Sequence, residues 1–152
     1  MTDYLIKQES PDQPDVVAML ARLDAYFGAL YPAESNHLMD VSALLQEDVV
    51  FLVARDADGR ACGCGAFVGR GDYAEVKRMY VEPAARGQGL GGKLLAGLVH
   101  RATLAGMPAL MLETGIKQPE AIGLYERDGF VRCPPFGAYQ ADPLSLFMVR
   151  AL

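Results

Sequence analysis

The sequence predicts a mixed α/β fold built on one central, mostly antiparallel sheet. Segments in which apolar residues alternate with a period of two are interleaved along the chain with segments of helical period. Three of the strand patterns follow one another with only short turns between them, which is typical of antiparallel neighbours. With 152 residues, 51% of them hydrophobic, the chain is expected to form a single domain over residues 1–152.

The N-terminal half is expected to hold one strand, two helices and three further strands. Pro11 and Pro14 end the first strand, and Asp12 or Asp15 can cap the helix that follows. The Asp-Ala-Asp-Gly turn at residues 56–59 predicts a hairpin. The expected elements are a strand at 4–8, helices at 16–30 and 41–46, and strands at 49–55, 60–68 and 73–81.

The C-terminal half is expected to alternate between helix and strand. Gly106 ends one helix, and Pro119 suits the first turn of the next. The expected elements are a helix at 94–104, a strand at 109–114, a helix at 119–128, and strands at 129–131 and 144–150. Strict alternation in the 73–81 strand predicts Ala74, Val76, Arg78 and Tyr80 on one face and Glu75, Lys77, Met79 and Val81 on the other.

A glycine-rich loop, Arg-Gly-Gln-Gly-Leu-Gly-Gly at residues 86–92, separates the 73–81 strand from the helix pattern that follows. Glycine permits positive φ and leaves room for a ligand close to the backbone. A curled loop that leads into a helix start presents free N–H groups at the positive end of the helix dipole. The loop therefore predicts an anion site, most often a phosphate site.

Two common phosphate-binding motifs fit parts of this loop but not its context. Gly87, Gly89 and Gly92 match the dinucleotide fingerprint, yet residues 82–86 separate them from the strand end and few residues remain for further βαβ units. A P-loop needs a hydroxyl residue after its lysine to hold Mg²⁺, and Leu94 has none. Both interpretations are disfavoured.

A third pattern, Arg/Gln-x-x-Gly-x-Gly, is met by Arg86, Gly89 and Gly91. With the strand at 75–81 before it, and Ala-Ile-Gly-Leu-Tyr-Glu-Arg-Asp-Gly-Phe at 121–130 after it, the pattern resembles the GNAT superfamily of N-acetyltransferases. The resemblance covers residues 60–131 by motif and the whole chain by element order. It implies the acyl-CoA N-acyltransferase fold, in which the sheet splays between its fourth and fifth strands and carries helices on both faces.

The resemblance also implies a site for acetyl-CoA. In the family the loop wraps the coenzyme A pyrophosphate, and the backbone of the preceding strand binds the pantetheine arm and polarises the thioester carbonyl. An asparagine found in many relatives is replaced here by Gln118. The expected cofactor-binding residues are Met79, Tyr80, Val81, Arg86, Gly87, Gln88, Gly89, Leu90, Gly91, Gly92, Lys93 and Gln118.

Two residues match catalytic positions of the family. Tyr125 matches the tyrosine that faces the thioester sulfur, where a phenol can protonate the departing thiolate; the alternative is a core aromatic residue. Glu75 matches the strand glutamate that serves some relatives as a general base; the alternative is a salt bridge on the sheet. Glu113 is a weaker candidate for the same role.

The acceptor is expected between the first helices, the start of the 73–81 strand and the C-terminal loops. Candidate acceptor contacts are Tyr26, Tyr31, Glu34 and His37. Acidic residues near this region favour a cationic acceptor; they are Asp24, Glu34, Asp40, Glu75 and Asp142.

Charge is distributed unevenly along the chain. The net charge of −5 argues against nucleic-acid binding. Residues 70–101 carry six basic and three acidic side chains, net +3, whereas residues 1–69 carry four basic and eleven acidic ones, net −7. The glycine loop therefore lies in the basic part of an acidic chain, which suits an anionic cofactor.

Several classes of protein do not fit the sequence. No apolar run approaches membrane-spanning length and no signal-peptide pattern opens the chain, so we expect a cytoplasmic protein without a membrane partner. Cys62, Cys64 and Cys133 predict free thiols rather than a disulfide framework, and no metal site is expected. Whether the chain forms a homodimer is left open.

The predicted function is transfer of the acetyl group of acetyl-CoA to a primary amine, expected to be a small molecule. Direct attack in a ternary complex is favoured, because the cysteines have no histidine partner in their sequence context. Two alternatives stay open: a non-catalytic acyl-CoA-binding module, against which Tyr125 argues, and acetylation of a protein or peptide amine. A nucleotide-linked oxidoreductase is disfavoured together with the dinucleotide motif.

Overall fold

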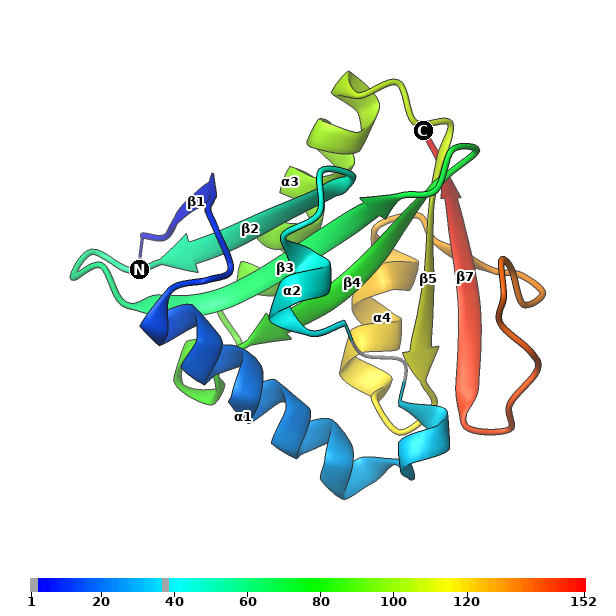
Figure 1. Ribbon diagram of the computed structural model, residues 1–152, viewed down its shortest axis with the longest axis horizontal. Coiled ribbons are helices and arrows are strands. Elements are labelled where there is room, and N and C mark those ends of the chain that lie inside the picture. Colours follow the sequence, from blue (N-terminus) through cyan, green and yellow to red (C-terminus); the bar gives the residue numbers. More distant parts are fainter. Residues whose placement is uncertain (1–2, 37–38) are drawn as a thin grey trace.

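The computed structural model describes residues 3–36 and 39–152. Its helices and strands follow the predicted order (Figure 1). They are β1 (Leu5–Gln8), α1 (Pro14–Leu30), the 3-10 helix η1 (Ala33–Ser35), α2 (Val41–Leu44), β2 (Val49–Arg55), β3 (Ala61–Gly69), β4 (Ala74–Val81), the 3-10 helix η2 (Pro83–Ala85), α3 (Leu90–Leu104), β5 (Ala109–Gly115), α4 (Pro119–Arg127), β6 (Val131–Arg132) and β7 (Ser145–Ala151).

The strands of the described chain form one sheet in the order β1-β2-β3-β4-β5-β7-β6. Every neighbouring pair is antiparallel except β4 and β5, which are parallel. The predicted mixed and mostly antiparallel sheet is therefore confirmed. Among the described helices, none is long and apolar enough to cross a membrane.

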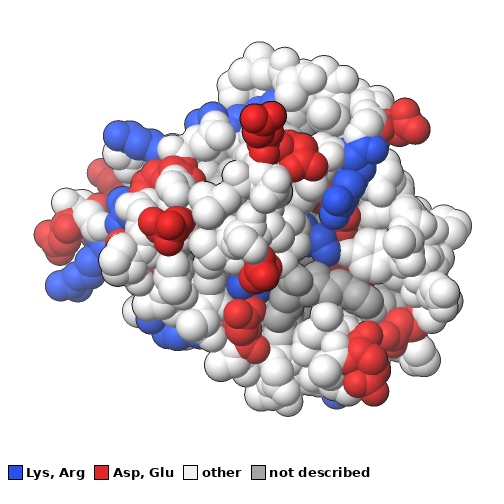
Figure 2. Space-filling view, in the orientation of Figure 1, with Lys and Arg blue, Asp and Glu red and all other residues white. Residues whose placement is uncertain are grey.

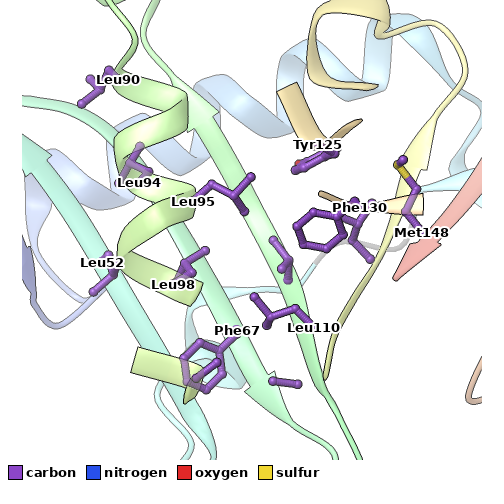
Figure 3. Packing of buried hydrophobic residues seen from close by; sticks show 14 of the residues in the cluster. Leu52, Phe67, Leu90, Leu94, Leu95, Leu98, Leu110, Tyr125, Phe130 and Met148 are labelled. Carbon is purple, nitrogen blue, oxygen red and sulfur yellow. The ribbon is translucent and has the colours of Figure 1, made fainter. Parts of the chain in front are cut away.

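Two apolar cores cover the two faces of the sheet, as the alternation in β2 illustrates. Leu52 and Ala54 pack in the core that contains α3 and α4, whereas Phe51 and Val53 pack in the core that contains α1 and α2. Figure 1 shows the two pairs of helices on opposite faces. Leu90, Leu94, Leu95 and Leu98 of α3 point toward the sheet in Figure 3, and burying each of these side chains contributes roughly 1.5–3 kcal/mol.

Strands β4 and β5 pair only at their first residues. Ala74 pairs with Leu110 and Glu75 with Met111, and no further pairing between these two strands is found in the described chain. Strand β5 continues along β7 as far as Gly115. The sheet therefore opens between β4 and β5, as the family resemblance implied.

A β-bulge in β4 sets which side chains face the opening. Cys64 pairs with Tyr80 and Ala66 with Lys77, so a single β3 residue, Gly65, lies opposite two β4 residues, Arg78 and Met79. Arg78 has φ 58°, the left-handed region, which costs an L-residue about 1–2 kcal/mol. The bulge is therefore a strained feature that its surroundings must stabilise.

The bulge makes the predicted alternation of β4 wrong beyond Lys77. Val76 and Met79 both pack toward the α3 core, whereas Tyr80 belongs to the α1 core. Arg78 pairs with Asp24 of α1 and so lies on the same face as Tyr80. The extra residue at the bulge thus puts Lys77 and Arg78, neighbours in sequence, on the face that α1 covers.

Helix α3 begins at Leu90, four residues before the predicted start. Gly89 caps it with φ 77°, and Gly91 and Gly92 form its first turn despite their low helix propensity. Helix α2 ends at Leu44 rather than residue 46; the Asp40 carboxylate caps its start by accepting a hydrogen bond from the Ala43 N–H at 2.9 Å. The earlier start of α3 brings its free N–H groups into the glycine loop.

Candidate active site

A cleft of about 700 Å³ follows the gap between β4 and β5 and reaches the start of α3. It has two parts. The loop half is lined by Arg86, Gly87, Gly89, Leu90, Gly91 and Gly92. The α1 half is lined by Phe27, Tyr31, Asn36, Lys77, Arg78 and Glu113. Tyr125 lines the cleft from α4.

The loop half presents backbone donors. Gly87 and Gly89 have φ 78° and 77°, which glycine adopts without strain. The first hydrogen bond within α3 runs from the Lys93 N–H to the Gly89 carbonyl at 3.1 Å, so the N–H groups of residues 89–92 have no helical acceptor. These groups lie at the positive end of the helix dipole, an arrangement that can bind an anion.

Arg86 is fixed beside this anion site. Its Nε donates to the Val81 carbonyl at 2.9 Å, and its guanidinium lies 5.8 Å from the ring centres of both Tyr26 and Tyr80. Gln88 and Lys93, the other two polar side chains predicted to bind the cofactor here, do not face the cleft as Arg86 does. Gln88 accepts a hydrogen bond from the Tyr4 hydroxyl at 3.1 Å, Lys93 is exposed, and neither lines the cleft.

The backbone of β4 offers a further donor at the gap. The Glu82 N–H donates to the Cys62 carbonyl of β3 at 2.8 Å. Because successive N–H groups of a strand point to opposite sides, the Val81 N–H points away from β3, toward the gap. Met79, Tyr80 and Val81, all predicted to bind the cofactor arm, line the cleft.

Tyr125 is buried beside Phe130. It is 6% exposed, and the two rings meet edge to face with their centres 5.7 Å apart (Figure 3). Burial, and secondarily the charge of Glu113, raises the pKa of the Tyr125 phenol far above its usual value of about 10. Tyr125 therefore keeps its proton over the whole physiological range.

Tyr31 ties the end of α1 to the segment after β5. Its hydroxyl accepts a hydrogen bond from the Lys117 N–H at 3.1 Å and donates one to Gln118 Oε1 at 3.3 Å. Burial raises the pKa of Tyr31. A Cβ at Gly115 would lie only 1.8 Å from the Tyr31 hydroxyl, so this approach requires glycine. Tyr31 and Gln118, which the sequence predicts to contact the acceptor and the cofactor respectively, both line the cleft.

Glu75 does not line the cleft. It is 3% exposed, and one carboxylate oxygen accepts hydrogen bonds from Arg70, at 3.2 Å from Nη2. The other accepts one from the Tyr139 hydroxyl at 2.5 Å and lies 3.2 Å from Lys77 Nζ. Burial, and then the hydrogen bond to Glu75, raises the pKa of Tyr139. The carboxylate thus holds Lys77 and the loop that carries Tyr139 in place.

The α1 half contains charged residues that the sequence analysis did not assign to the site. Lys77 and Arg78 line it, and Figure 2 shows basic atoms in the middle of this face, between acidic side chains. Arg78 pairs with Asp24, and Lys77 pairs with Glu75. Two of the acidic residues expected to attract a cationic acceptor are therefore engaged by basic side chains of this chain. The sequence held one signal for this charged floor, because Lys77 and Arg78 are consecutive charged residues in a central strand. Strict alternation nevertheless predicted that they lie on opposite faces of the sheet.

The other predicted acceptor contacts differ in position. Tyr26 lines the cleft at its exposed edge, next to Arg86. Glu34 is exposed and does not line it, whereas its neighbours Ser35 and Asn36 do. His37 lies outside the described residues.

Diverging parallel strands, a helix start with free N–H groups and a buried tyrosine at the gap define an acyl-CoA-dependent N-acyltransferase fold. Residues 16–130 match the acetyltransferase (GNAT) family. The chain therefore belongs to the GNAT family of acetyltransferases, enzymes that use acetyl-CoA, and the resemblance seen in the sequence is confirmed.

Individual relatives agree with this assignment. A protein from Azospirillum brasilense, named IAA acetyltransferase, is 49% identical over 154 residues that cover 100% of both chains. A crystal structure assigned as an acyl-CoA N-acyltransferase from Klebsiella pneumoniae has a TM-score of 0.86 and 41% identity, over 98% of this chain and 97% of that one. The PaiA N-acetyltransferase of Thermoplasma acidophilum, solved in complex with coenzyme A, shares the fold at 16% identity, with a TM-score of 0.72 over 99% of each chain.

The hydrogen bond from Tyr139 to Glu75 generates a stability prediction. Tyr139→Phe leaves a buried carboxylate oxygen without one of its donors, which costs about 1–3 kcal/mol. The melting temperature should fall by about 2–4 °C for each kcal/mol lost. Tyr4→Phe, which removes an exposed hydroxyl bonded to Gln88, is the control and should change stability by less than about 0.5 kcal/mol. Equal melting temperatures for the two variants would contradict the structural role of the pair.

Proposed function

We propose that this enzyme transfers the acetyl group of acetyl-CoA to the amine of a small molecule by direct attack in a ternary complex. One observation carries the proposal: a single cleft joins the free N–H groups of α3, the unpaired edge of β4 and the hydroxyl-bearing ring of Tyr125. An IAA acetyltransferase that is 49% identical over its whole length supports acetyl transfer by this chain.

The residues of the cleft fit acetyl-CoA. The N–H groups of residues 89–92 and the guanidinium of Arg86 would hold its pyrophosphate. A Cβ built on Gly89 meets no atom within 4 Å, so space is open beside the backbone where a phosphate would lie. The Val81 N–H, together with the backbone of Met79 and Tyr80, would hold the pantetheine arm along β4. Gln118 would line the opposite wall.

Bound acetyl-CoA would supply an acetyl thioester: the acceptor nitrogen bonds to the acetyl carbon, the carbon–sulfur bond breaks, one proton leaves the nitrogen, and the sulfur takes up another. Tyr125 is the proposed proton donor. Burial keeps the Oη proton on Tyr125 while the substrates bind, the departing sulfur takes that proton, and solvent then returns a proton to the phenolate. Burial against Phe130 holds the ring in one orientation.

Glu113 is better placed than Glu75 to take the proton of the amine. Glu113 lines the cleft, and its charge contributes to the raised pKa of Tyr125, so the two groups are electrostatically close. The Glu75 carboxylate is buried among Arg70, Lys77 and Tyr139. We therefore propose Glu113 as the base, and a supporting role for Glu75 through Lys77.

The mouth of the α1 half favours a small acceptor over a peptide. The Ser35 hydroxyl donates to the Asp142 carboxylate at 2.8 Å and joins the segment after α1 to the loop between β6 and β7. Packing of Phe136 and Tyr139 against Phe147 holds that loop on the sheet. An extended peptide would need to cross this connection. Acetylation of lysine in a folded protein faster than of any free amine would favour the peptide alternative.

Cofactor binding is tested by Gly89→Val. The new side chain fills the space beside the first turn of α3 and disfavours φ 77°, so the rise in melting temperature on adding acetyl-CoA should disappear. Gly106→Val is the matched control: Gly106 follows the other end of α3, has φ 78° and also meets nothing within 4 Å of a Cβ. It should lose similar stability and keep the acetyl-CoA response. A full response in both variants would refute the loop assignment.

Proton donation is tested by Tyr125→Phe. The ring and its contact with Phe130 remain, so folding and acetyl-CoA affinity should change little, while kcat falls roughly 10²-fold or more. Because the pKa of Tyr125 is raised, its acid form persists as pH increases. Deprotonation of Tyr125 should therefore cause no loss of wild-type kcat at any pH up to about 10. Near-normal kcat for the variant would leave Tyr125 as a packing residue.

A further inference from the structure

Arg78 is a buried cation with unused hydrogen-bonding capacity at the floor of the α1 half. The residue is 7% exposed and its side chain 2% exposed, yet it lines the cleft. Nη1 donates to Asp24 Oδ1 at 2.6 Å. Nε is buried and has no hydrogen-bond partner within the part of the chain that the structure describes. Buried polar groups are nearly always satisfied, so this donor is open to an acceptor that the described residues do not supply.

The geometry of the guanidinium indicates which acceptor fits. Nη1 is engaged by Asp24, and Nε has no partner among the described residues, so the edge of the guanidinium that carries Nε is the one proposed for a ligand. That edge presents two parallel N–H donors, which match the two oxygens of a carboxylate. The β-bulge turns Arg78 toward α1 and into the cleft. In this position the Arg78 backbone has φ 58°, in the left-handed region, and is therefore strained.

We propose that the acceptor is an amino acid, with a carboxylate bound by Arg78 and an amine directed toward Glu113. This inference deepens the proposed function and rests on it. Lys77, on the same face, is balanced by Glu75 at 3.2 Å, and Arg78 by the half-exposed Asp24, whose side chain is 51% exposed. Glu113 on β5 supplies negative charge across the gap. The α1 half thus offers a guanidinium donor and a carboxylate to a molecule that carries both a carboxylate and an amine.

Selectivity between matched acceptors tests this assignment. Acetyl transfer is measured for L-leucine, L-phenylalanine and L-lysine and for the amines without the carboxylate: isopentylamine, 2-phenylethylamine and cadaverine. The wild-type enzyme should favour at least one amino acid over its amine by about 10²-fold or more in kcat/KM, because the amine leaves Arg78 unpaired. Arg78→Met should reduce that ratio to less than about 10-fold, mainly by raising KM for the amino acid.

Two further variants separate recognition from a structural role. Asp24→Asn removes the ion pair with α1 but keeps the guanidinium, so it should preserve most of the selectivity. Arg78→Lys keeps the charge but loses the two-pronged edge, so its selectivity should fall below that of the wild type. Added guanidinium should partly restore selectivity to Arg78→Met. If Asp24→Asn loses as much selectivity as Arg78→Met, or if wild type prefers the amines, the inference is refuted while acetyl transfer to amines stands.

Binding provides a readout that does not depend on turnover. Calorimetry on the complex with coenzyme A compares N-acetyl-L-phenylalanine with N-acetyl-2-phenylethylamine, which differ only in the carboxylate. Tighter binding of the acid by about 10-fold or more in the wild type, lost in Arg78→Met, is expected. Absence of acetyl transfer to every amine would refute the proposed function, and equal binding of the two acetylated compounds would refute the carboxylate site.

Discussion

The early separation of β4 from β5 is the constraint on which the rest of the structure depends. Two residue pairs hold these parallel strands together, after which each continues without the other. A strand edge in the interior leaves backbone donors unpaired, and each unsatisfied buried donor costs about 1–3 kcal/mol. The gap is stable because it is a cleft open to solvent and ligands, and because two separate cores, one on each face, hold the strands on either side.

The functional groups lie along that gap for reasons that are local in sequence. Gly89 permits the tight entry into α3 that aims free N–H groups at one end, and the bulge at Arg78 places two cations on the α1 side. Tyr125, packed between the α3 core and the cleft, keeps its proton because it is buried. One opened strand pair thus brings together the proposed anion site, an unpaired backbone edge, the proposed proton donor and the charged floor of the proposed acceptor site.

Much of this arrangement could be predicted from the sequence, and the exceptions have physical causes. Periodicity identified nearly every strand and helix, and the glycine loop indicated the proposed anion site, because both signals are local. The bulge has no periodic signature: Lys77 and Arg78 read as ordinary alternation, and only pairing with Gly65 reveals the extra residue. The engagement of Glu75 by Tyr139, 64 residues away, likewise depends on a long-range contact that spacing does not encode.

Amide hydrogen exchange with and without acetyl-CoA tests the role of the gap most directly, because it reports on individual backbone donors. Binding should slow exchange at Leu90, Gly91 and Gly92 and at Val81, whose N–H groups lack acceptors in the α3 helix or on β3. Amides of β1 and β6, at the sheet edges, should exchange at unchanged rates. Protection confined to other segments, with Val81 and the first turn of α3 unaffected, would contradict the assignment of the β4–β5 gap as the acetyl-CoA site.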